Sequence, residues 1–436
     1  MTTSNKLNTE SYKGVRDFYP EDMAIQKHIF NTMQKTAERF GYIEYSASVL
    51  EPAELYRAKS GEEIINEQTY TFTDRGDREV TLRPEMTPTV ARMVAARKRE
   101  LPFPLRWYSI PNLFRYEKPQ RGRLREHWQL NVDIFGIESH NAEVEIILIA
   151  SATIRAFGLE NSDFTIRINS RKVVNYVLRE IFFFDEQTAY KLSKLIDKKN
   201  KMKEEEFNQM ISEITGSKGA EFLTILNSKN LDEYISHLPA HARGHQSIQE
   251  IQEVIQKLDF LGVTNVSFDQ TLMRGFDYYT GIVFEAFDNH PDNRRALLGG
   301  GRYDDLLSIF GGEKVPTVGF GMGDVTVRDM LETYNLLPAY QSSAVLAICP
   351  TDESAVPFSN EIAQRLREEN INVAVDYSDK KIGDKMKIVD KQKIPFAICV
   401  GKNEISSGKY LLKHMITRKE KEVTEADIIR AIKGDE

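Results

Sequence analysis

The sequence is poor in the features that mark secreted, membrane-embedded and disulfide-bonded proteins. It has only two cysteines, Cys349 and Cys399, each inside a short apolar run typical of a strand. Such residues are interpreted as small core side chains in a reducing compartment, not as a disulfide or metal pair. No run approaches the roughly 18 apolar residues that a membrane span needs, and the first residues lack the apolar segment of a secretion signal. We therefore expect a cytoplasmic protein with no membrane partner.

Two common nucleotide-binding loops are also missing. The chain has no GxxxxGK[ST] motif, and no GxGxxG motif follows a strand and opens a helix. Residues 319–323, GFGMG, contain half of such a pattern after an apolar run. Those glycines would equally allow a helix to pack closely on a sheet, and packing is the preferred interpretation. If the protein binds a nucleotide, it does so on another scaffold.

The charge of the chain is only weak evidence about its binding partners. The net charge is −7, which on average disfavours a nucleic acid. The segment from Asp379 to Lys393 is nevertheless rich in lysine. A modest basic face there could contact phosphates even on an acidic protein.

The pattern of apolar residues predicts a mixed α+β chain with three kinds of region. Before residue 172 and after residue 256, helices alternate with hairpin-like strand pairs; between them the chain reads as helical and rich in Lys and Glu, like an inserted module. Beyond a linker at 336–343, alternating strands and helices predict a small α/β domain. The clearest elements are helices at 22–40, 84–99 and 141–157 and a hairpin at 69–82.

The most informative stretch is 113–133, LFRYEKPQRGRLREHWQLNVD. Its two ends alternate as strands do, and PQRG between them is turn chemistry, so an antiparallel hairpin with a long loop is predicted. An arginine guanidinium can bind a phosphate through two hydrogen bonds, so several arginines in one loop indicate a polyanionic substrate. A solvated basic loop is the alternative interpretation. The five cations of the stretch are Arg115, Lys118, Arg121, Arg123 and Arg125.

Three further patterns carry weaker signals. In RGFDYYTG (274–281), a strand would place Asp277 and Tyr279 opposite Phe276 and Tyr278. In LGGGRYD (298–304), three glycines before a helix could form an anion-binding nest or simply a tight turn. Histidines 237, 241 and 245 have helical spacing, but a proline and a glycine interrupt them, so surface histidines near a turn are preferred over a metal site.

Together these motifs carry a family resemblance. RPEMT (83–87), FRYEKPQRGRLREHWQ (114–129), RGFDYYTG and GGGRYD, in this order, resemble the histidyl-tRNA synthetases. FRYE with its loop is similar to the second signature of class II aminoacyl-tRNA synthetases, the segment ending at Pro52 to the first, and VGFGMG to the third. The resemblance implies an antiparallel sheet flanked by helices, a helical insertion, an α/β anticodon-binding domain and a homodimer. The expected boundaries are 1–171 and 257–335 for the catalytic core, 172–256 for the insertion and 343–436 for the anticodon-binding domain.

The resemblance also implies the reaction. ATP and L-histidine would form histidyl-adenylate, with Mg²⁺ accompanying ATP, and histidine would then pass to its tRNA. No protein nucleophile or protein-bound metal site is needed, so catalysis would rest on positioning and charge stabilisation.

Site residues follow by matching motifs. Arg115 and Arg274 would be catalytic, acting at the α-phosphate, and both would also contact histidine. Glu117 would bind the adenine amino group and Arg123 the terminal phosphates, leaving the loop tip near Arg121 free for the tRNA end. Histidine's amino group would meet Glu85 and Thr87. Its imidazole would meet Gln129, Asp133, Tyr278 and Tyr279.

One position departs from the family. The third signature usually continues as Gly-x-Glu-Arg, with the arginine stacked on adenine, whereas here Thr326 takes the arginine's place. Arg328 lies two residues later, about 200° around a helix, and is a poor substitute. This departure keeps a second hypothesis open, a non-catalytic histidine-sensing paralogue that regulates histidine biosynthesis. Such paralogues usually lack the anticodon-binding domain and a complete RGFDYYTG, and this chain keeps both.

Overall fold

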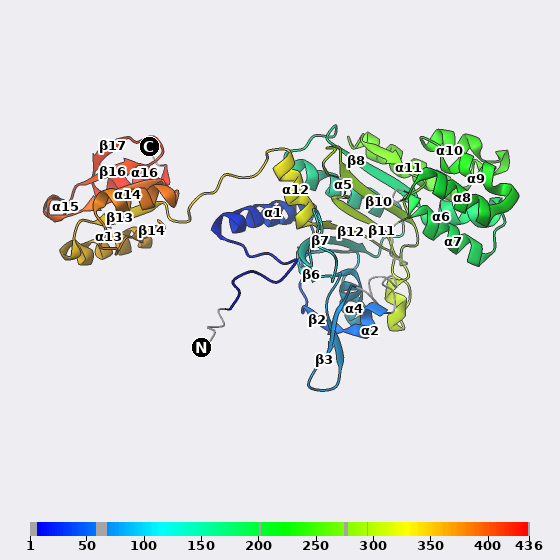
Figure 1. The fold of residues 1–436 in the computed structure, drawn as a ribbon, viewed down its shortest axis with the longest axis horizontal. Coiled ribbons are helices and arrows are strands. Elements are labelled where there is room, and N and C mark those ends of the chain that lie inside the picture. Colours follow the sequence, from blue (N-terminus) through cyan, green and yellow to red (C-terminus); the bar gives the residue numbers. More distant parts are fainter. Residues whose placement is uncertain (1–6, 58–67, 200–201, 274–277, 294, 435–436) are drawn as a thin grey trace, which may run out of the picture. The chain divides into compact units, whose positions relative to one another are not determined.

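The computed structural model describes residues 7–57, 68–199, 202–273, 278–293 and 295–434. The chain forms two compact units, Met1–Leu337 and Pro338–Glu436 (Figure 1). Within the described residues, no helix is long and apolar enough to cross a membrane.

A large, mostly antiparallel sheet forms the centre of the first unit. Among the described residues it has nine strands in the order β1-β5-β7-β12-β11-β10-β8-β9, with β6 paired to β7 beside this path. Only the outer pairs β1–β5 and β8–β9 are parallel. This confirms the predicted α+β fold. The strands are β1 (Ile43–Glu44), β5 (Leu105–Ser109), β6 (Asn112–Phe114), β7 (Glu126–Phe135), β8 (Phe164–Ser170), β9 (Val266–Phe268), β10 (Ile282–Asp288), β11 (Leu298–Arg302) and β12 (Thr317–Gly323).

Helices bury apolar stripes against this sheet. Helix α1 places Ile29, Met33 and Ala37 four residues apart on one face, and all three are fully buried in the core. The same core takes in Ile146 and Ile147 of α5. The predicted helices at 22–40, 84–99 and 141–157 are thus confirmed. The helices around the sheet are α1 (Pro20–Arg39), α4 (Thr87–Arg97), α5 (Asn141–Ala156), the 3₁₀ turn η5 (Leu306–Phe310) and α12 (Asp324–Thr333).

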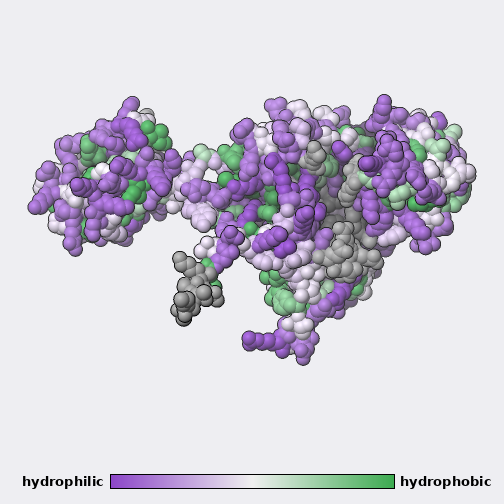
Figure 2. Space-filling view, in the orientation of Figure 1, coloured by the Kyte–Doolittle hydropathy of each residue, from purple (hydrophilic) through white to green (hydrophobic). Residues whose placement is uncertain are grey.

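A small three-stranded sheet lies beside the large one. It has the order β2-β4-β3 and contains the predicted hairpin at 69–82. Figure 2 shows an apolar area of the surface over β2, and Leu50 and Phe72 of this sheet are exposed. Its elements are β2 (Leu50–Pro52), α2 (Ala53–Arg57), β3 (Tyr70–Thr73) and β4 (Glu79–Leu82).

The described part of 172–256 consists of helices joined by turns and contains no strand, which agrees with the predicted helical character. Its side chains Leu192, Phe207, Phe222 and Ile248 belong to the same hydrophobic cluster as the core of the large sheet. Of its histidines, His245 caps α11 and stacks on Tyr176, with ring centroids 3.6 Å apart. The helices are α6 (Arg171–Tyr176), the π-turn η1 (Val177–Ile181), α7 (Glu186–Ile196), α8 (Glu204–Thr215), η3 (Gly216–Lys218), α9 (Gly219–Leu226), α10 (Leu231–His237), η4 (Ala240–Ala242) and α11 (Gln246–Phe260).

The second unit is the predicted α/β module. Its five described strands follow the order β14-β13-β15-β16-β17. Cys349 and Cys399 are paired neighbours on the parallel strands β13 and β15, and both are free thiols. The elements are β13 (Leu346–Pro350), η6 (Glu353–Ala355), α13 (Val356–Glu368), β14 (Val373–Val375), α14 (Ile382–Lys391), β15 (Phe396–Val400), α15 (Lys402–Ser407), β16 (Tyr410–His414), β17 (Glu420–Val423) and α16 (Glu425–Lys433).

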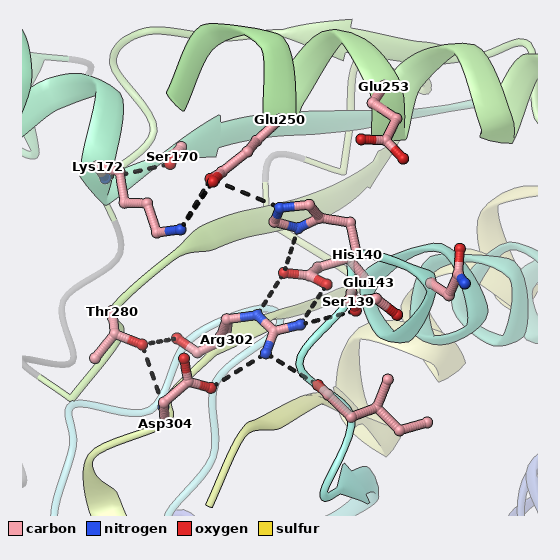
Figure 3. A network of polar contacts seen from close by, with 12 residues as sticks. Ser139, His140, Glu143, Ser170, Lys172, Glu250, Glu253, Thr280, Arg302 and Asp304 are labelled. Atoms are coloured by element: carbon pink, nitrogen blue, oxygen red, sulfur yellow. Dashed lines mark hydrogen bonds and ion pairs between the residues drawn. The ribbon is translucent and has the colours of Figure 1, made fainter. Parts of the chain in front are cut away.

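A buried ion pair ties β11 to α5 (Figure 3). Arg302 binds Glu143 through two nitrogens, at 2.6 and 2.7 Å, and the two side chains are 4% and 0% exposed. Burial alone would raise the pKa of Glu143, but the bonds from Arg302 and His140 outweigh it and hold that pKa below its ordinary value. His140 also faces Glu250 of α11 at 3.7 Å, and Glu250 binds Lys172. The network therefore joins the large sheet to the helical region.

Candidate functional site

A cavity of about 1380 Å³ lies against one face of the large sheet. Five adjacent strands contribute residues to it, and on β7, β8 and β12 these residues are two apart, so they share a face of the sheet. The loop 115–125, the loop between β10 and β11, residues of 269–273 and the start of α12 border other sides. The strand residues on its wall are His127 and Gln129 of β7, Thr165 and Arg167 of β8, Glu285, Phe287 and Asp288 of β10, Leu298 and Gly299 of β11, and Gly321 and Gly323 of β12.

The hairpin predicted at 113–133 is present, with β6 and β7 as its strands. Two of its five cations, Arg115 and Arg123, line the cavity. Arg125 instead lies over the Tyr116 ring, 4.0 Å from its centroid. Arg121, expected to be free, binds Asn293 at 3.0 Å and Thr333 at 2.9 Å. The loop tip is therefore attached to the core.

Arg115 is held by the loop that carries RPEMT. Its Nε donates to the Pro84 carbonyl at 2.8 Å. That loop is itself fixed by the buried Arg83, which donates to the carbonyls of Ala47 and Asn112. The position of the Arg115 guanidinium is thus set before any substrate arrives.

Glu117 and Arg123 form an ion pair across the loop. The Glu117 Oε2 and Arg123 Nε atoms are 2.6 Å apart, and Glu117 is 7% exposed while Arg123 is 41% exposed. This part of the cavity therefore has one buried acceptor, Glu117, and one partly exposed cation, Arg123.

Glycines of GFGMG make room for the polar residues of β7. Strand β12 pairs with β7 so that Gly319 faces Asp133 and Gly321 faces Asn131. A Cβ atom at Gly319 would overlap the Asp133 carboxylate, and one at Gly321 would overlap the Gln129 amide. The preferred interpretation, helix packing, is therefore wrong. The glycines allow two site side chains to lie flat across the sheet.

Asp133 is a buried carboxylate with an unfilled acceptor. It is 3% exposed, its Oδ1 accepts a hydrogen bond from Tyr303, and its Oδ2 has no partner among the described residues. Burial raises the pKa of Asp133 to about 7, although the Tyr303 bond acts against that shift. A ligand N–H group would satisfy Oδ2, so this atom marks a binding position for a donor.

This pKa predicts a pH-dependent stability. Between about pH 4 and pH 7 the folded chain keeps a proton on Asp133 that the unfolded chain has released. The free energy of unfolding should therefore fall as pH rises through this range and level off above it. Asp133→Asn removes this contribution. In urea unfolding, the free energy of unfolding of the variant relative to the parent should therefore be higher at about pH 8 than at about pH 5. An equal difference at both pH values would contradict the assignment.

Four further predicted histidine-binding residues, Glu85, Thr87, Tyr278 and Tyr279, are not on the cavity wall. Tyr278 donates to Glu85 at 3.2 Å, and both side chains are buried. Thr87 opens α4, two residues after Glu85. Tyr278, Tyr279 and Tyr303 form an aromatic cluster with ring centroids 4.8 to 6.4 Å apart.

Two predictions about the motifs are wrong. Strand β10 begins at Ile282, so Tyr278 and Tyr279 do not alternate across a sheet, and their rings pack side by side. LGGGR forms strand β11, so it is neither an anion nest nor a tight turn. Arg274, the predicted catalytic arginine, lies outside the described residues, as does Asp277.

The structure adds three residues to the site. Tyr303 reaches Asp133, His127 lines the cavity close to Arg115, and Arg295 lines the same cavity. Burial and the nearby guanidinium groups lower the pKa of His127 to about 3, so its ring is neutral. Tyr303 and His127 stand inside motifs quoted above; Arg295 had no sequence signal.

The chain resembles known proteins along almost all of its length. A family model described as histidyl-tRNA synthetase matches residues 14–325, and one described as anticodon binding domain matches residues 344–435. The histidine–tRNA ligase of Leptospira biflexa is 39% identical over 99% of this chain and 98% of its own. That of Thermoplasma volcanium is 35% identical over 97% of this chain and 98% of its own.

Solved structures share the fold. A histidyl-tRNA synthetase from Nostoc sp. PCC 7120 has a TM-score of 0.82 at 22% identity, covering 98% of this chain and all of the other. A Bacillus halodurans structure described as ATP phosphoribosyltransferase regulatory subunit/histidyl-tRNA synthetase has a TM-score of 0.73 at 24% identity, covering 88% of this chain and 97% of the other.

Proposed function

Because the chain belongs to the histidyl-tRNA synthetase family, we propose that it charges histidine tRNA in two steps, through a histidyl-adenylate intermediate. The enzyme is thus an aminoacyl-tRNA ligase that uses histidine, ATP and tRNA. The two-step proposal rests on two residues, Gln129 and Asp133, that share one face of strand β7. Gln129 borders a cavity that holds Arg115 and Arg123, and Asp133, with its unfilled acceptor, lies on the same strand face.

In the first step a histidine carboxylate oxygen attacks the α-phosphorus of ATP. The bond to the bridging oxygen breaks, and pyrophosphate leaves. Arg115 stabilises the negative charge that grows on the α-phosphate, with Arg274 proposed beside it, while Arg123 binds the departing phosphates. Glu117 accepts from the adenine amino group. Arg123 must release Glu117 in part to do this, which its exposed position favours.

Histidine is recognised by groups buried beside the cavity. The ionised Asp133 Oδ2 accepts a hydrogen bond from one imidazole N–H. Gln129 lies four residues before Asp133, on the same face of β7. Glu85 is the counter-ion for the α-ammonium group, with Thr87 next to it and Tyr278 and Tyr279 closing the pocket. A site of buried polar partners of this kind rejects apolar analogues by roughly 10⁴–10⁵.

Magnesium is proposed to arrive with ATP. Among the described residues no group of three or more His, Cys, Asp or Glu side chains could hold a metal alone. Glu285 stands on the cavity wall, and Mg²⁺ in nucleotide sites uses one or two carboxylates together with phosphate oxygens and waters. When bound, it neutralises phosphate charge.

In the second step a ribose hydroxyl of the terminal tRNA adenosine attacks the acyl carbon, and AMP leaves. We assign anticodon contacts to residues 343–436, supported by the family match there. Residues 1–171 and 257–335 would form the cytoplasmic enzyme's catalytic core, and 172–256 the insertion. A homodimer through the first-signature region is supported by the exposed apolar residues Ile43, Leu50 and Phe72. Sedimentation at micromolar concentration tests it: a monomer would refute the dimer.

Histidine-dependent exchange of labelled pyrophosphate into ATP tests the adenylate step. Exchange should appear with histidine and Mg²⁺ and be absent when either is left out. A full-length preparation that binds histidine but shows no exchange would support the regulatory paralogue. That alternative is not favoured, because the chain matches the anticodon-binding domain and keeps Arg115, Glu117 and Arg123 in one cavity.

A further inference from the structure

Arg295 lies in the loop between β10 and β11 and lines the cavity together with Arg123 and Thr326. Its side chain crosses the arginine-rich loop: a Cβ atom at Gly122 would lie 2.6 Å from the Arg295 Cδ atom. Its Nε donates to the Arg121 carbonyl at 3.2 Å. These contacts hold the stem of the side chain and leave the guanidinium at the cavity border.

The charge of Arg295 is not neutralised locally. In the described part of the chain it makes no ion pair of its own, and the nearest carboxylate influence comes from Glu117, which already binds Arg123 at 2.6 Å. Burial and Arg123 outweigh Glu117 and lower the pKa of Arg295 below its ordinary value. A half-buried guanidinium kept beside another cation is what an anionic or π-rich ligand would compensate.

Thr326 lines the same cavity as Arg295. Its hydroxyl donates to the backbone carbonyls of Gly323, at 3.1 Å, and Leu297, at 3.4 Å. The side chain therefore stops at the backbone, two residues from Arg295. Arg328 points elsewhere, because it binds Asp22 at 2.8 Å and Glu332 at 3.1 Å.

We propose that Arg295 is the cation at the purine end of the ATP site, supplied from the β10–β11 loop where the third signature provides none. The proposal rests on the proposed function. Arg295 binds the Arg121 carbonyl of the loop that carries Glu117, the residue assigned to the adenine amino group, and the charge of Glu117 acts on Arg295, so the guanidinium lies near the proposed adenine position. A guanidinium can lie over a purine face as it does over an aromatic side chain.

In a competing explanation, Arg295 only supports the structure of the loop. Loss of this structural support would misplace Arg115, Glu117 and Arg123 together, and would weaken the binding of ATP, pyrophosphate and histidine alike. Loss of a purine contact would weaken the binding of ATP and AMP, and would leave the binding of pyrophosphate and histidine unchanged. These patterns separate the two roles.

The experiment measures pyrophosphate exchange by the full-length enzyme and its variants. Arg295→Ala and Arg295→Gln should raise the KM for ATP by roughly 3- to 30-fold, with the KM values for histidine and pyrophosphate within about twofold of the parent. AMP, which lacks the terminal phosphates, should lose affinity by a similar factor. The matched control Arg328→Ala, the cation nearest to Thr326 in sequence, should leave all three KM values unchanged.

A rescue variant completes the test. Arg295→Ala combined with Thr326→Arg returns a guanidinium to the cavity from α12 but cannot restore the contact with the Arg121 carbonyl. It should recover most of the lost ATP affinity. An unchanged KM for ATP in Arg295→Ala, parallel losses for all substrates, or no rescue would each overturn the proposal. Absent exchange by the parent enzyme would instead overturn the proposed function.

Discussion

Replacing Arg115 with alanine is expected to lower the rate of histidine-dependent pyrophosphate exchange by about 10²–10³. The Nε atom of Arg115 is committed to the Pro84 carbonyl at 2.8 Å, which aims the remaining donors at the cavity. Such a preorganised donor acts when negative charge grows on the α-phosphate, so its loss should lower kcat more than it raises the KM for ATP.

Two variants control this prediction. Lys118 lies in the same loop but is exposed and outside the cavity wall, so Lys118→Ala should exchange at the parental rate. Arg115→Lys keeps the charge, but one ammonium cannot bind the Pro84 carbonyl and the substrate in the guanidinium's geometry, so it should recover only part of the rate. Parental exchange by a folded Arg115→Ala enzyme would remove Arg115 from the mechanism.

Replacing Arg302 with methionine is expected to cost about 3–5 kcal/mol of unfolding free energy. The change leaves Glu143, which is 0% exposed, as a buried carboxylate without its two guanidinium bonds and with only the 3.3 Å contact to His140. The carbonyls of Ile137 and Ser139 would also lose their donors. Urea unfolding near neutral pH measures the effect, read from probes in the first unit.

The double variant Glu143→Leu with Arg302→Met should recover most of that loss, because an apolar pair of similar volume does not bury a lone charge. As a surface control, Arg78→Met removes an exposed pair with Asp74 and should change stability by about 1 kcal/mol or less. A loss in Arg302→Met no larger than in this control would show that the buried pair contributes little.

Features encoded by local pattern were predicted correctly. The hairpin at 113–133 was predicted because strand alternation and turn residues are properties of neighbouring positions. The same holds for α1 and α5, whose apolar residues recur with helical spacing. The motif matches placed Arg115, Glu117, Arg123 and Gln129, which the folded chain brings to one cavity.

Features that depend on a distant segment were predicted wrongly or not at all. The glycines of GGGRYD looked like a nest, yet Gly300 is required because a Cβ atom there would overlap the Gly319 carbonyl of the adjacent strand. The alternation in RGFDYYTG resembled a strand, but Tyr278 turns instead toward Glu85, which lies far away in sequence. No residue near either motif in the sequence indicates these contacts.

The sequence by itself determined the family and the clearest helices and hairpins, because motifs and periodicities are short-range. Only the tertiary structure decided which groups meet: Tyr303 on Asp133, Glu117 on Arg123, and Arg295 in one cavity with Thr326. Charge and hydrogen-bond energies depend on distance and burial, and both arise when strands far apart in the chain pair in one sheet. The proposed replacement for the missing third-signature arginine, Arg295, therefore lies in another loop, outside that signature.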